Sequence, residues 1–349
     1  MSIHSGISSF NDLGQFFRTF LEKKSVLSED FNSLENKFLQ SIQKAESENP
    51  WFTRENIFLA LEQWAKVLTT TDLENWTKQY KYTENPKRVG VIMAGNIPLV
   101  GFHDLLSVLL SGHQLIVKTS SKDDALIDFI LDFLMNSNEK FNSSIQKTER
   151  LKDFDAVIAT GSNNTARYFD YYFRKVPSII RKNRTSVAVL TGEESPEDLR
   201  NLGKDLFSYF GLGCRNVTKI YLPKNFNTDL LFESFYDWKS VIHHTKYANN
   251  YEYNRAVYLL SKEAFLDNNF VILKESKELH SPVGVVYFEF YNNSNELKNE
   301  LHNLQEEIQC VVAQTQNEFS DSVKFGQTQN PSLNDYADGV DVMQFLENL

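Results

Sequence analysis

Arg88-Val-Gly-Val-Ile-Met-Ala-Gly-Asn-Ile-Pro98 is a short apolar run that leads into a loop with glycine and proline, and a stretch of helical length follows it. Three more short apolar runs lie at residues 114–118, 155–159 and 186–190, with amphipathic stretches between them. Apolar runs of this length that alternate with helices are typical of parallel strands buried on both faces. The pattern predicts an α/β fold with a doubly wound parallel sheet.

The sequence on either side of this block has a different texture. Residues 1–85 read as helices, because apolar residues recur three and four positions apart at 9–17 and at 53–62, where Thr53 can cap the helix. From about residue 191 a second α/β block begins. We expect a helix there at about 196–210, strands at 217–222, 270–273 and 284–290, helical stretches through residue 260 and a turn at 292–295.

Composition argues against several classes of function. With 46 acidic and 36 basic residues, the 349-residue chain carries a net charge of −10 and no Lys/Arg-rich run, which disfavours a nucleic-acid partner. It has no apolar signal core and no stretch near the ~20 apolar residues of a membrane span. Cys214 and Cys310 are far apart and form no disulfide or metal-ligand pattern. We expect a cytoplasmic protein of enzyme size with no metal.

Cys214 lies in Tyr209-Phe-Gly-Leu-Gly-Cys-Arg-Asn216, between an expected helix and an expected strand. The two glycines let the backbone bend and keep bulk away from the sulfur, while Arg215 and nearby backbone N–H groups favour the thiolate. A thiol in this setting suits a nucleophile in covalent chemistry. The alternative is a small buried cysteine that packs as a hydrophobic side chain, which is the commoner role of this residue type.

Asn96 follows the first expected strand, at the edge where doubly wound folds bind ligands. Its side-chain amide could donate a hydrogen bond to an oxyanion. Alternatively, Asn96 could simply cap a helix that begins at Pro98.

The second and third strands also end in polar loops. Lys118 is followed by Ser120 and Ser121, a setting that suits the ribose or phosphate of a nucleotide and equally a solvated lysine. Gly161 and Ser162 lead into a helix whose first N–H groups could hold a pyrophosphate, although one glycine alone is a weak signal.

A fourth loop, Lys277-Glu-Leu-His-Ser-Pro-Val283, separates two expected strands. His280 invites the hypothesis of a Cys–His dyad with Cys214. A lone histidine in a turn is more often structural, so both interpretations stay open.

Taken in order, these loops resemble those of the aldehyde dehydrogenase superfamily. Its members place an asparagine after the first sheet strand, then a Lys-Pro-Ser-Glu loop, a Gly-Ser turn, a Gly-Gln-x-Cys nucleophile and a Glu-x-Phe-Gly-Pro-Val loop. Within that superfamily the chain looks most like the LuxC-type fatty acyl-CoA reductases. The likeness rests on Arg184-Thr-Ser-Val-Ala-Val-Leu190, Phe325-Gly-Gln-Thr-Gln-Asn-Pro331 and Asp335-Tyr-Ala-Asp-Gly-Val-Asp341.

The resemblance implies an aldehyde-dehydrogenase-like fold with four parts. We expect a helical N-terminal segment packed on the cofactor domain (1–85), a Rossmann-like nucleotide-binding domain (86–190), an α/β catalytic domain that carries the cysteine (191–320) and a C-terminal tail that returns to the core (321–349). The implied roles are the acyl-accepting nucleophile for Cys214, an oxyanion donor for Asn96, adenosine ribose or phosphate contacts for Lys118, Ser120 and Ser121, pyrophosphate contacts for Gly161 and Ser162, and a nicotinamide-ribose contact for Glu278.

Three departures from the superfamily pattern refine this expectation. Oxidising, hydrolytic members carry a glutamate base in a Glu-Leu-Gly-Gly segment, whereas the corresponding stretch here is Arg181-Lys-Asn-Arg184, so no carboxylate is available there to activate water. The cations of this stretch could meet the phosphates of coenzyme A or form a solvated basic loop. Ser121 replaces the acid that would bind a free ribose 2′-hydroxyl, which favours NADPH. His280-Ser281 replace the usual Phe-Gly, which leaves the packing beside the nicotinamide open.

The resemblance therefore implies NADPH-dependent reduction of a fatty acyl thioester to the aldehyde through an acyl group on Cys214. The acyl donor would be coenzyme A or acyl carrier protein, and the superfamily's habit of oligomerisation implies a homo-oligomer. Two alternatives remain: a degenerate acyl- or nucleotide-binding partner subunit without turnover, and a hydrolytic aldehyde dehydrogenase.

Overall fold

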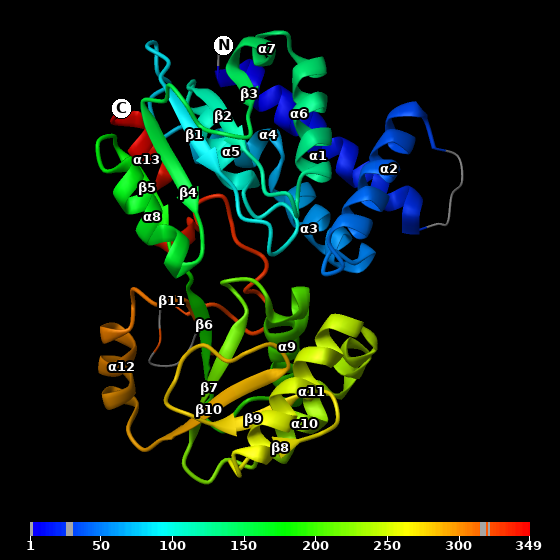
Figure 1. The fold of residues 1–349 in the computed structure, drawn as a ribbon, viewed down its shortest axis with the longest axis vertical. Coiled ribbons are helices and arrows are strands. Elements are labelled where there is room, and N and C mark those ends of the chain that lie inside the picture. Colours follow the sequence, from blue (N-terminus) through cyan, green and yellow to red (C-terminus); the bar gives the residue numbers. More distant parts are fainter. Residues whose placement is uncertain (1–2, 26–30, 315–318, 320–321) are drawn as a thin grey trace. The chain divides into compact units, whose positions relative to one another are not determined.

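The computed structural model describes residues 3–25, 31–314, 319 and 322–349. The chain divides into two compact units: Met1–Asn183 together with Ser332–Leu349, and Arg184–Pro331. Figure 1 shows the helices and strands of each. Among the described residues, no helix combines the length and the apolarity that crossing a bilayer requires.

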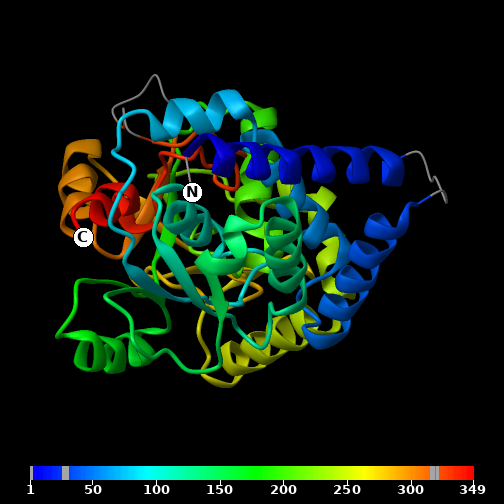
Figure 2. The ribbon, with the colours of Figure 1, turned by 90° about the horizontal axis from the view of Figure 1, so that it is seen from above.

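The first unit opens with four helices, α1 (Ile3–Ser25), α2 (Ser33–Glu48), α3 (Arg54–Val67) and α4 (Thr70–Thr77). The Thr53 hydroxyl accepts the Asn56 N–H at 3.3 Å and caps α3, as the sequence predicts. Helix α1 packs against α3 and against two later helices, α5 (Phe102–Leu110) and α6 (Ala125–Ser137), and so joins the N-terminal helices to the sheet that follows (Figure 2).

A five-stranded sheet in the order β3-β2-β1-β4-β5 forms the centre of this unit. Its strands are β1 (Arg88–Ile92), β2 (Gln114–Lys118), β3 (Ile145–Lys147), β4 (Ala156–Thr160) and β5 (Ser178–Arg181), and each described pair is parallel. Between them run α5 (Phe102–Leu110), α6 (Ala125–Ser137), α7 (Lys140–Ser144) and α8 (Asn163–Phe173). The carboxyl ends of β2, β1 and β4 therefore lie side by side at one edge, where this fold class binds ligands.

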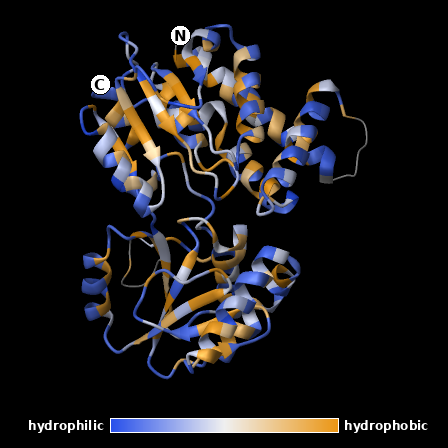
Figure 3. Ribbon diagram, in the orientation of Figure 1, coloured by the Kyte–Doolittle hydropathy of each residue, from blue (hydrophilic) through white to orange (hydrophobic). Residues whose placement is uncertain are grey.

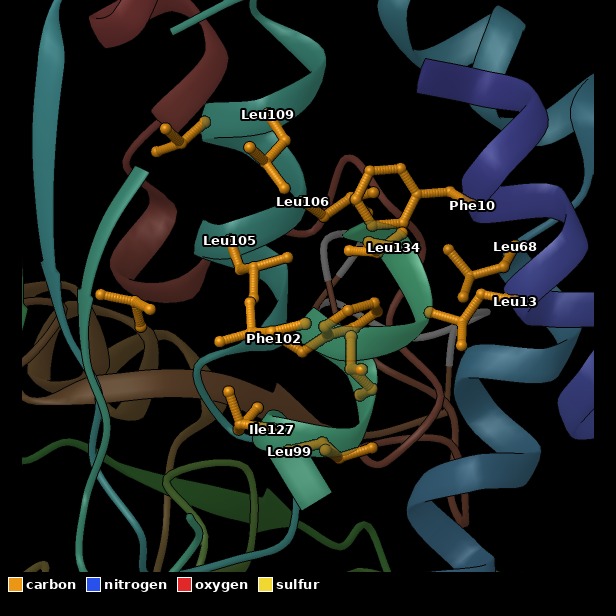
Figure 4. Close-up of a cluster of buried hydrophobic side chains, with 14 of the residues drawn as sticks. Phe10, Leu13, Leu68, Leu99, Phe102, Leu105, Leu106, Leu109, Ile127 and Leu134 are labelled. Atoms are coloured by element: carbon orange, nitrogen blue, oxygen red, sulfur yellow. The ribbon is translucent and has the colours of Figure 1, made fainter. Parts of the chain in front are cut away.

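The core of the first unit lies between the sheet and the N-terminal helices. Figure 4 shows Phe10 and Leu13 of α1 facing Phe102 and Leu106 of α5, with Leu134 of α6 beside them. All five of these side chains are fully buried. Burying a side chain of this size stabilises the folded state by about 1.5–3 kcal/mol relative to leaving it exposed, so this cluster is a main source of the unit's stability.

Residues 332–349 complete that same core. Helix α13 (Val342–Glu347), which follows the short 3₁₀ turn η3 (Ala337–Gly339), buries Val342, Met343 and Leu346. The Trp76 indole N–H donates to the Tyr336 hydroxyl at 2.8 Å.

The second unit is built on a six-stranded sheet in the order β11-β6-β7-β10-β9-β8. The strands are β6 (Thr185–Val189), β7 (Val217–Pro223), β8 (Leu266–Asp267), β9 (Ile272–Glu275), β10 (Val285–Tyr291) and β11 (Ile308–Val312), with β8 alone antiparallel to its neighbour. The helical elements are α9 (Pro196–Phe207), η1 (Ser208–Gly211), α10 (Asp229–Phe235), η2 (Tyr236–His243), α11 (Thr245–Leu260) and α12 (Ser294–Asn303). Figure 3 shows that the central strands of both sheets are hydrophobic, as strands buried on both faces require.

These elements refine the expected organisation. The strand expected at 186–190 is present as β6, but it pairs with β7 and β11 in the second sheet, because an apolar run alone does not say which sheet a strand joins. The expected turn at 292–295 contains Asn293, which caps α12. The predicted boundary between catalytic domain and tail, at residues 320 and 321, lies outside the described residues.

Candidate active site

The loop that carries Cys214 follows α9 through an unusual backbone. Three successive residues, Tyr209, Phe210 and Gly211, have φ angles of 53°, 57° and 77°. Non-glycine residues seldom adopt this left-handed conformation, so the surrounding structure must hold it in place. Because of this sharp turn, α9 ends at Phe207 and not at residue 210 as expected, and the chain then turns towards β7.

Asn216 holds this loop. Its side chain is fully buried and accepts the Gly213 N–H at 2.8 Å, while its amide donates to the carbonyls of Ser208 at 2.8 Å and Asp205 at 3.1 Å. One side chain therefore ties the end of α9 to the backbone next to Cys214. Cys214 itself is half-buried.

A second set of contacts reaches the carbonyl of Cys214. The Ser186 hydroxyl, on β6, donates to that carbonyl at 3.1 Å and lies 2.9 Å from the Cys310 sulfur. Burial raises the pKa of Cys310 to about 11, although the Ser186 hydroxyl and the Arg215 charge act in the opposite direction. Cys310 is thus held as a thiol.

Asp205 joins this loop to a distant segment of the same unit. Its buried carboxylate accepts the backbone N–H groups of Gly326 at 2.6 Å and Thr328 at 3.0 Å, and the Thr328 hydroxyl at 2.8 Å. Desolvation raises the pKa of Asp205 to about 6, against these three hydrogen bonds, which lower it. The segment 325–328 is therefore anchored to the helix that precedes Cys214.

Asn96 lies exposed in the loop that follows β1. Helix α5 begins only at Phe102 with Gly101 at its N-cap, so Asn96 does not cap it and that interpretation is wrong. The loop turns sharply at Leu99, whose φ is 59° and whose N–H donates to the buried Asp123 carboxylate at 2.8 Å.

Gly95 explains how closely this loop approaches the next one. A Cβ at Gly95 would lie 2.4 Å from the Ser120 hydroxyl oxygen, so no larger residue fits without displacement. The loops that carry Asn96 and Ser120 therefore pack directly against each other.

Lys118, Ser121, Asp124 and Lys147 line a surface cavity of about 520 Å³, together with Thr119, Thr148 and Glu149. The Thr148 N–H donates to the Val117 carbonyl at 2.9 Å, which places the ends of β2 and β3 side by side. Lys147 lies 2.7 Å from Asp124 and 2.5 Å from Asp128. Burial disfavours its charge, but these hydrogen bonds and the two carboxylate charges outweigh burial and raise the pKa of Lys147.

Gly161 and Ser162 directly precede α8, which begins at Asn163, three residues before the expected helical stretch. The Ser162 hydroxyl accepts the Thr165 N–H at 3.3 Å and caps the helix. The first N–H groups of α8 and the exposed Ser162 lie at the carboxyl end of β4, beside the loop of Asn96 at the end of β1.

The basic stretch 181–184 is largely engaged within the fold. Buried Arg181 makes two hydrogen bonds to Asp104 of α5, at 2.5 and 2.8 Å. Arg184 donates to the carbonyls of Gln305 at 3.1 Å and Ile308 at 3.4 Å. These two guanidinium groups are therefore structural, and only exposed Lys182 keeps the character of a solvated basic loop.

Glu278 and His280 are both exposed in the loop between β9 and β10. The Thr218 hydroxyl, near the start of β7, donates to the Leu279 carbonyl at 2.7 Å. The start of β7 also follows Cys214, so the second unit brings the Glu278 loop and the Cys214 loop to the same end of its sheet.

Comparison with models of protein families shows which family this chain resembles. The family model described as acyl-CoA reductase (LuxC) matches residues 22–224. The chain belongs to the LuxC family. Comparison of this LuxC-family chain with curated protein sequences found no match.

Solved structures show the same fold. An aldehyde dehydrogenase from Mycobacterium tuberculosis, complexed with NAD⁺, is similar with a TM-score of 0.63 and 12% identity over 92% of this chain and 75% of that one. Aldehyde dehydrogenase 21 from Physcomitrella patens, in complex with succinate, is similar with a TM-score of 0.66 and 10% identity over 100% of this chain and 84% of that one. The predicted α/β fold of the aldehyde dehydrogenase type, with its helical N-terminal segment, is confirmed.

Several residues that hold the candidate site of this LuxC-family chain together could not be predicted from its sequence. Asn216, Ser186, Thr218 and Lys219 hold the loops of Cys214 and Glu278 from buried or partly buried positions. Of these, only Asn216 carried a local signal, because it stands two positions after the candidate nucleophile Cys214 and its residue type favours turns.

Proposed function

We propose that this LuxC-family chain reduces a fatty acyl thioester to the aldehyde with NADPH, through a covalent acyl group on Cys214. The observation that supports this most is the fixed loop of Cys214, which Asn216 and Ser186 hold in a strained backbone conformation. Residues held in sparsely populated backbone conformations cluster at active sites. Family membership supplies the substrate class.

In the proposed reaction, the Cys214 thiolate attacks the carbonyl carbon of the acyl thioester. The bond from that carbon to the coenzyme A sulfur breaks, and coenzyme A leaves as a thiolate. The Asn96 amide and the backbone N–H of Cys214 stabilise the oxyanion that forms on the way; loss of one such donor lowers the rate about 10²- to 10³-fold.

Water should not compete for the acyl group. The stretch 181–184 holds no carboxylate that could act as a base, and Arg181 and Arg184 are hydrogen-bonded within the fold. The acyl group on Cys214 is therefore stable until a reductant or a thiol reaches it.

The first unit suits a dinucleotide cofactor. The α8 N-terminus with Ser162 suits a pyrophosphate, and the cavity beside Lys118 offers two ammonium groups and the hydroxyls of Thr119, Ser121 and Thr148. When bound, reduced nicotinamide would supply a hydride to the acyl carbon; the bond from that carbon to the Cys214 sulfur would then break, which frees the aldehyde and returns Cys214 to the thiolate. In the second unit, Glu278 would contact the nicotinamide ribose.

Preference for NADPH depends on the balance of charge in that cavity. The positive charges of Lys118 and Lys147 favour a 2′-phosphate. Two negative charges oppose it, because Asp124 is already paired with Lys147 and Glu149 also lines the cavity. We expect Lys118→Met to lower the ratio of NADPH to NADH affinity about tenfold and Glu149→Gln to raise it, measured by titration of the full chain with each nucleotide. Equal affinity of the unmodified protein for both nucleotides would refute the preference for NADPH.

The covalent step has a direct test. The protein is incubated with a fatty acyl-CoA and digested, and the mass of the Cys214 peptide is measured. We expect one acyl group there, none in Cys214→Ala, and an unchanged adduct in Cys310→Ala. A protein that binds acyl-CoA without forming the adduct would be a non-catalytic binding subunit, and aldehyde-dependent reduction of NAD⁺ without coenzyme A would indicate a hydrolytic dehydrogenase.

A further inference from the structure

Lys219 on β7 is fully buried in the second unit. Its ammonium group lies 2.6 Å from the Glu289 carboxylate of β10 and 4.7 Å from the centre of the Tyr221 ring. It also donates a hydrogen bond to the backbone carbonyl of Lys277 at 3.0 Å. The Glu289 carboxylate thus neutralises the buried charge, and a second N–H of the ammonium group is directed at the loop between β9 and β10.

The neighbouring residue makes a matching contact. The Thr218 hydroxyl donates to the Leu279 carbonyl at 2.7 Å and is 2.6 Å from the Thr185 hydroxyl of β6. The two anchored carbonyls, of residues 277 and 279, stand on either side of Glu278. At the start of the same loop, the Glu278 N–H donates to the Ser276 hydroxyl at 3.2 Å, so the backbone is fixed before, at and after this residue.

Stability of the fold does not explain why a lysine occupies this buried position. Removing two charges from water is costly, and replacing a buried ion pair by apolar side chains of similar volume is often neutral or stabilising. The hydrogen bond from the buried Lys219 ammonium group to the Lys277 carbonyl is better explained by a functional role of the loop that this bond fixes. The exposed Glu278 carboxylate is the ionisable group that this loop presents between the two anchored carbonyls.

We propose that Lys219 and Thr218 are positioning residues that fix Glu278 for its contact with the ribose of the nicotinamide cofactor. The inference rests on the cofactor role of Glu278 in the proposed function. Because β7 begins directly after the Cys214 loop, one strand then sets the positions of both the nucleophile and the carboxylate that orients the reductant.

A double-mutant cycle tests this inference, with the dissociation constant of NADPH measured by fluorescence on the full chain. We expect Lys219→Met and Glu278→Ala each to weaken NADPH binding about tenfold, and the double variant to bind no more weakly than Glu278→Ala alone. In steady-state assays, Lys219→Met should raise the KM for NADPH more than it lowers kcat. Thr218→Val should show a smaller change in the same direction, and it serves in place of Lys219→Met if that variant fails to fold.

Lys274→Met is the matched control. Lys274 also lies in this sheet, is mostly buried, and pairs with a carboxylate, Glu263, at 2.8 Å. We expect it to leave NADPH affinity unchanged.

Additive effects of Lys219→Met and Glu278→Ala would overturn the inference, because they would show that Lys219 acts independently of Glu278. Unchanged affinity in Glu278→Ala would overturn it as well, by removing the cofactor contact itself. Both results concern NADPH affinity alone and would leave the test for an acyl group on Cys214 unaffected. Failure of this inference can therefore be distinguished from failure of the proposed covalent mechanism.

Discussion

Asn216→Ala should destabilise the second unit and release the loop of Cys214. Among the hydrogen bonds that the substitution removes, the three shortest, all buried, are those of 2.8, 2.8 and 3.1 Å to Gly213, Ser208 and Asp205. At about 1 kcal/mol each, their loss costs about 3 kcal/mol. The Gly213 N–H then stays buried without its acceptor, which adds about 1–2 kcal/mol, so we expect a total loss of about 4–5 kcal/mol.

The free energy of unfolding in urea measures this loss. Hydrogen exchange of residues 208–216, followed by mass spectrometry, should show in addition that protection falls in the loop itself. Asn250→Ala is a matched control, because the Asn250 amide makes one solvent-exposed hydrogen bond to Lys246, and we expect a change below about 0.5 kcal/mol. A loss below about 1 kcal/mol in Asn216→Ala would refute the conclusion that this side chain holds the loop.

Three further predictions follow from buried groups. Burial raises the pKa of Cys310 to about 11, so only about a thousandth of this side chain is thiolate at pH 8. Iodoacetamide should therefore modify Cys214 well before Cys310. Equal labelling of the two cysteines, measured from the peptide masses, would contradict this prediction. Arg181→Met leaves Asp104 buried without its partner and should cost about 3–5 kcal/mol in urea unfolding, whereas the double variant with Asp104→Leu should recover part of that loss. Burial lowers the pKa of His113, whose two ring nitrogens form hydrogen bonds with the Lys87 N–H and the Leu346 carbonyl. As pH falls, the unfolded chain takes up a proton at this histidine before the folded protein does, so the free energy of unfolding should fall below about pH 6.5. His113→Gln should lose that dependence, and a free energy of unfolding that does not change with pH in the unmodified protein would contradict the prediction.

Sequence patterns predicted the elements of the fold better than their assembly. The run 114–118 coincides with β2, and Thr53 caps α3, because strands and caps are determined by residues that are close in the chain. Membership of β6 in the second sheet depends on its pairing with β7 and β11, which lie far away in sequence.

The candidate site was predictable only where its residues stand in loops. Cys214 and Asn96 could be proposed from the glycines, the proline and the strand ends around them, whereas Glu278 was proposed only through the resemblance to the aldehyde dehydrogenase superfamily. Lys219 could not, because a charged residue in a strand predicts a solvent-facing position, whereas here its charge is neutralised by Glu289, 70 residues further along the chain. Buried polar groups that serve a distant loop leave no local signature.

The return of residues 332–349 to the first unit has a consequence for biosynthesis. Ribosomes release a chain from its N-terminus onwards, and domains generally fold as units during synthesis. The second unit, Arg184–Pro331, is continuous and can close as soon as it emerges. The first unit must wait for Val342, Met343 and Leu346 to fill its core. The unit translated first is therefore completed last, and the place of α13 in its core stays unfilled until α13 has been synthesised.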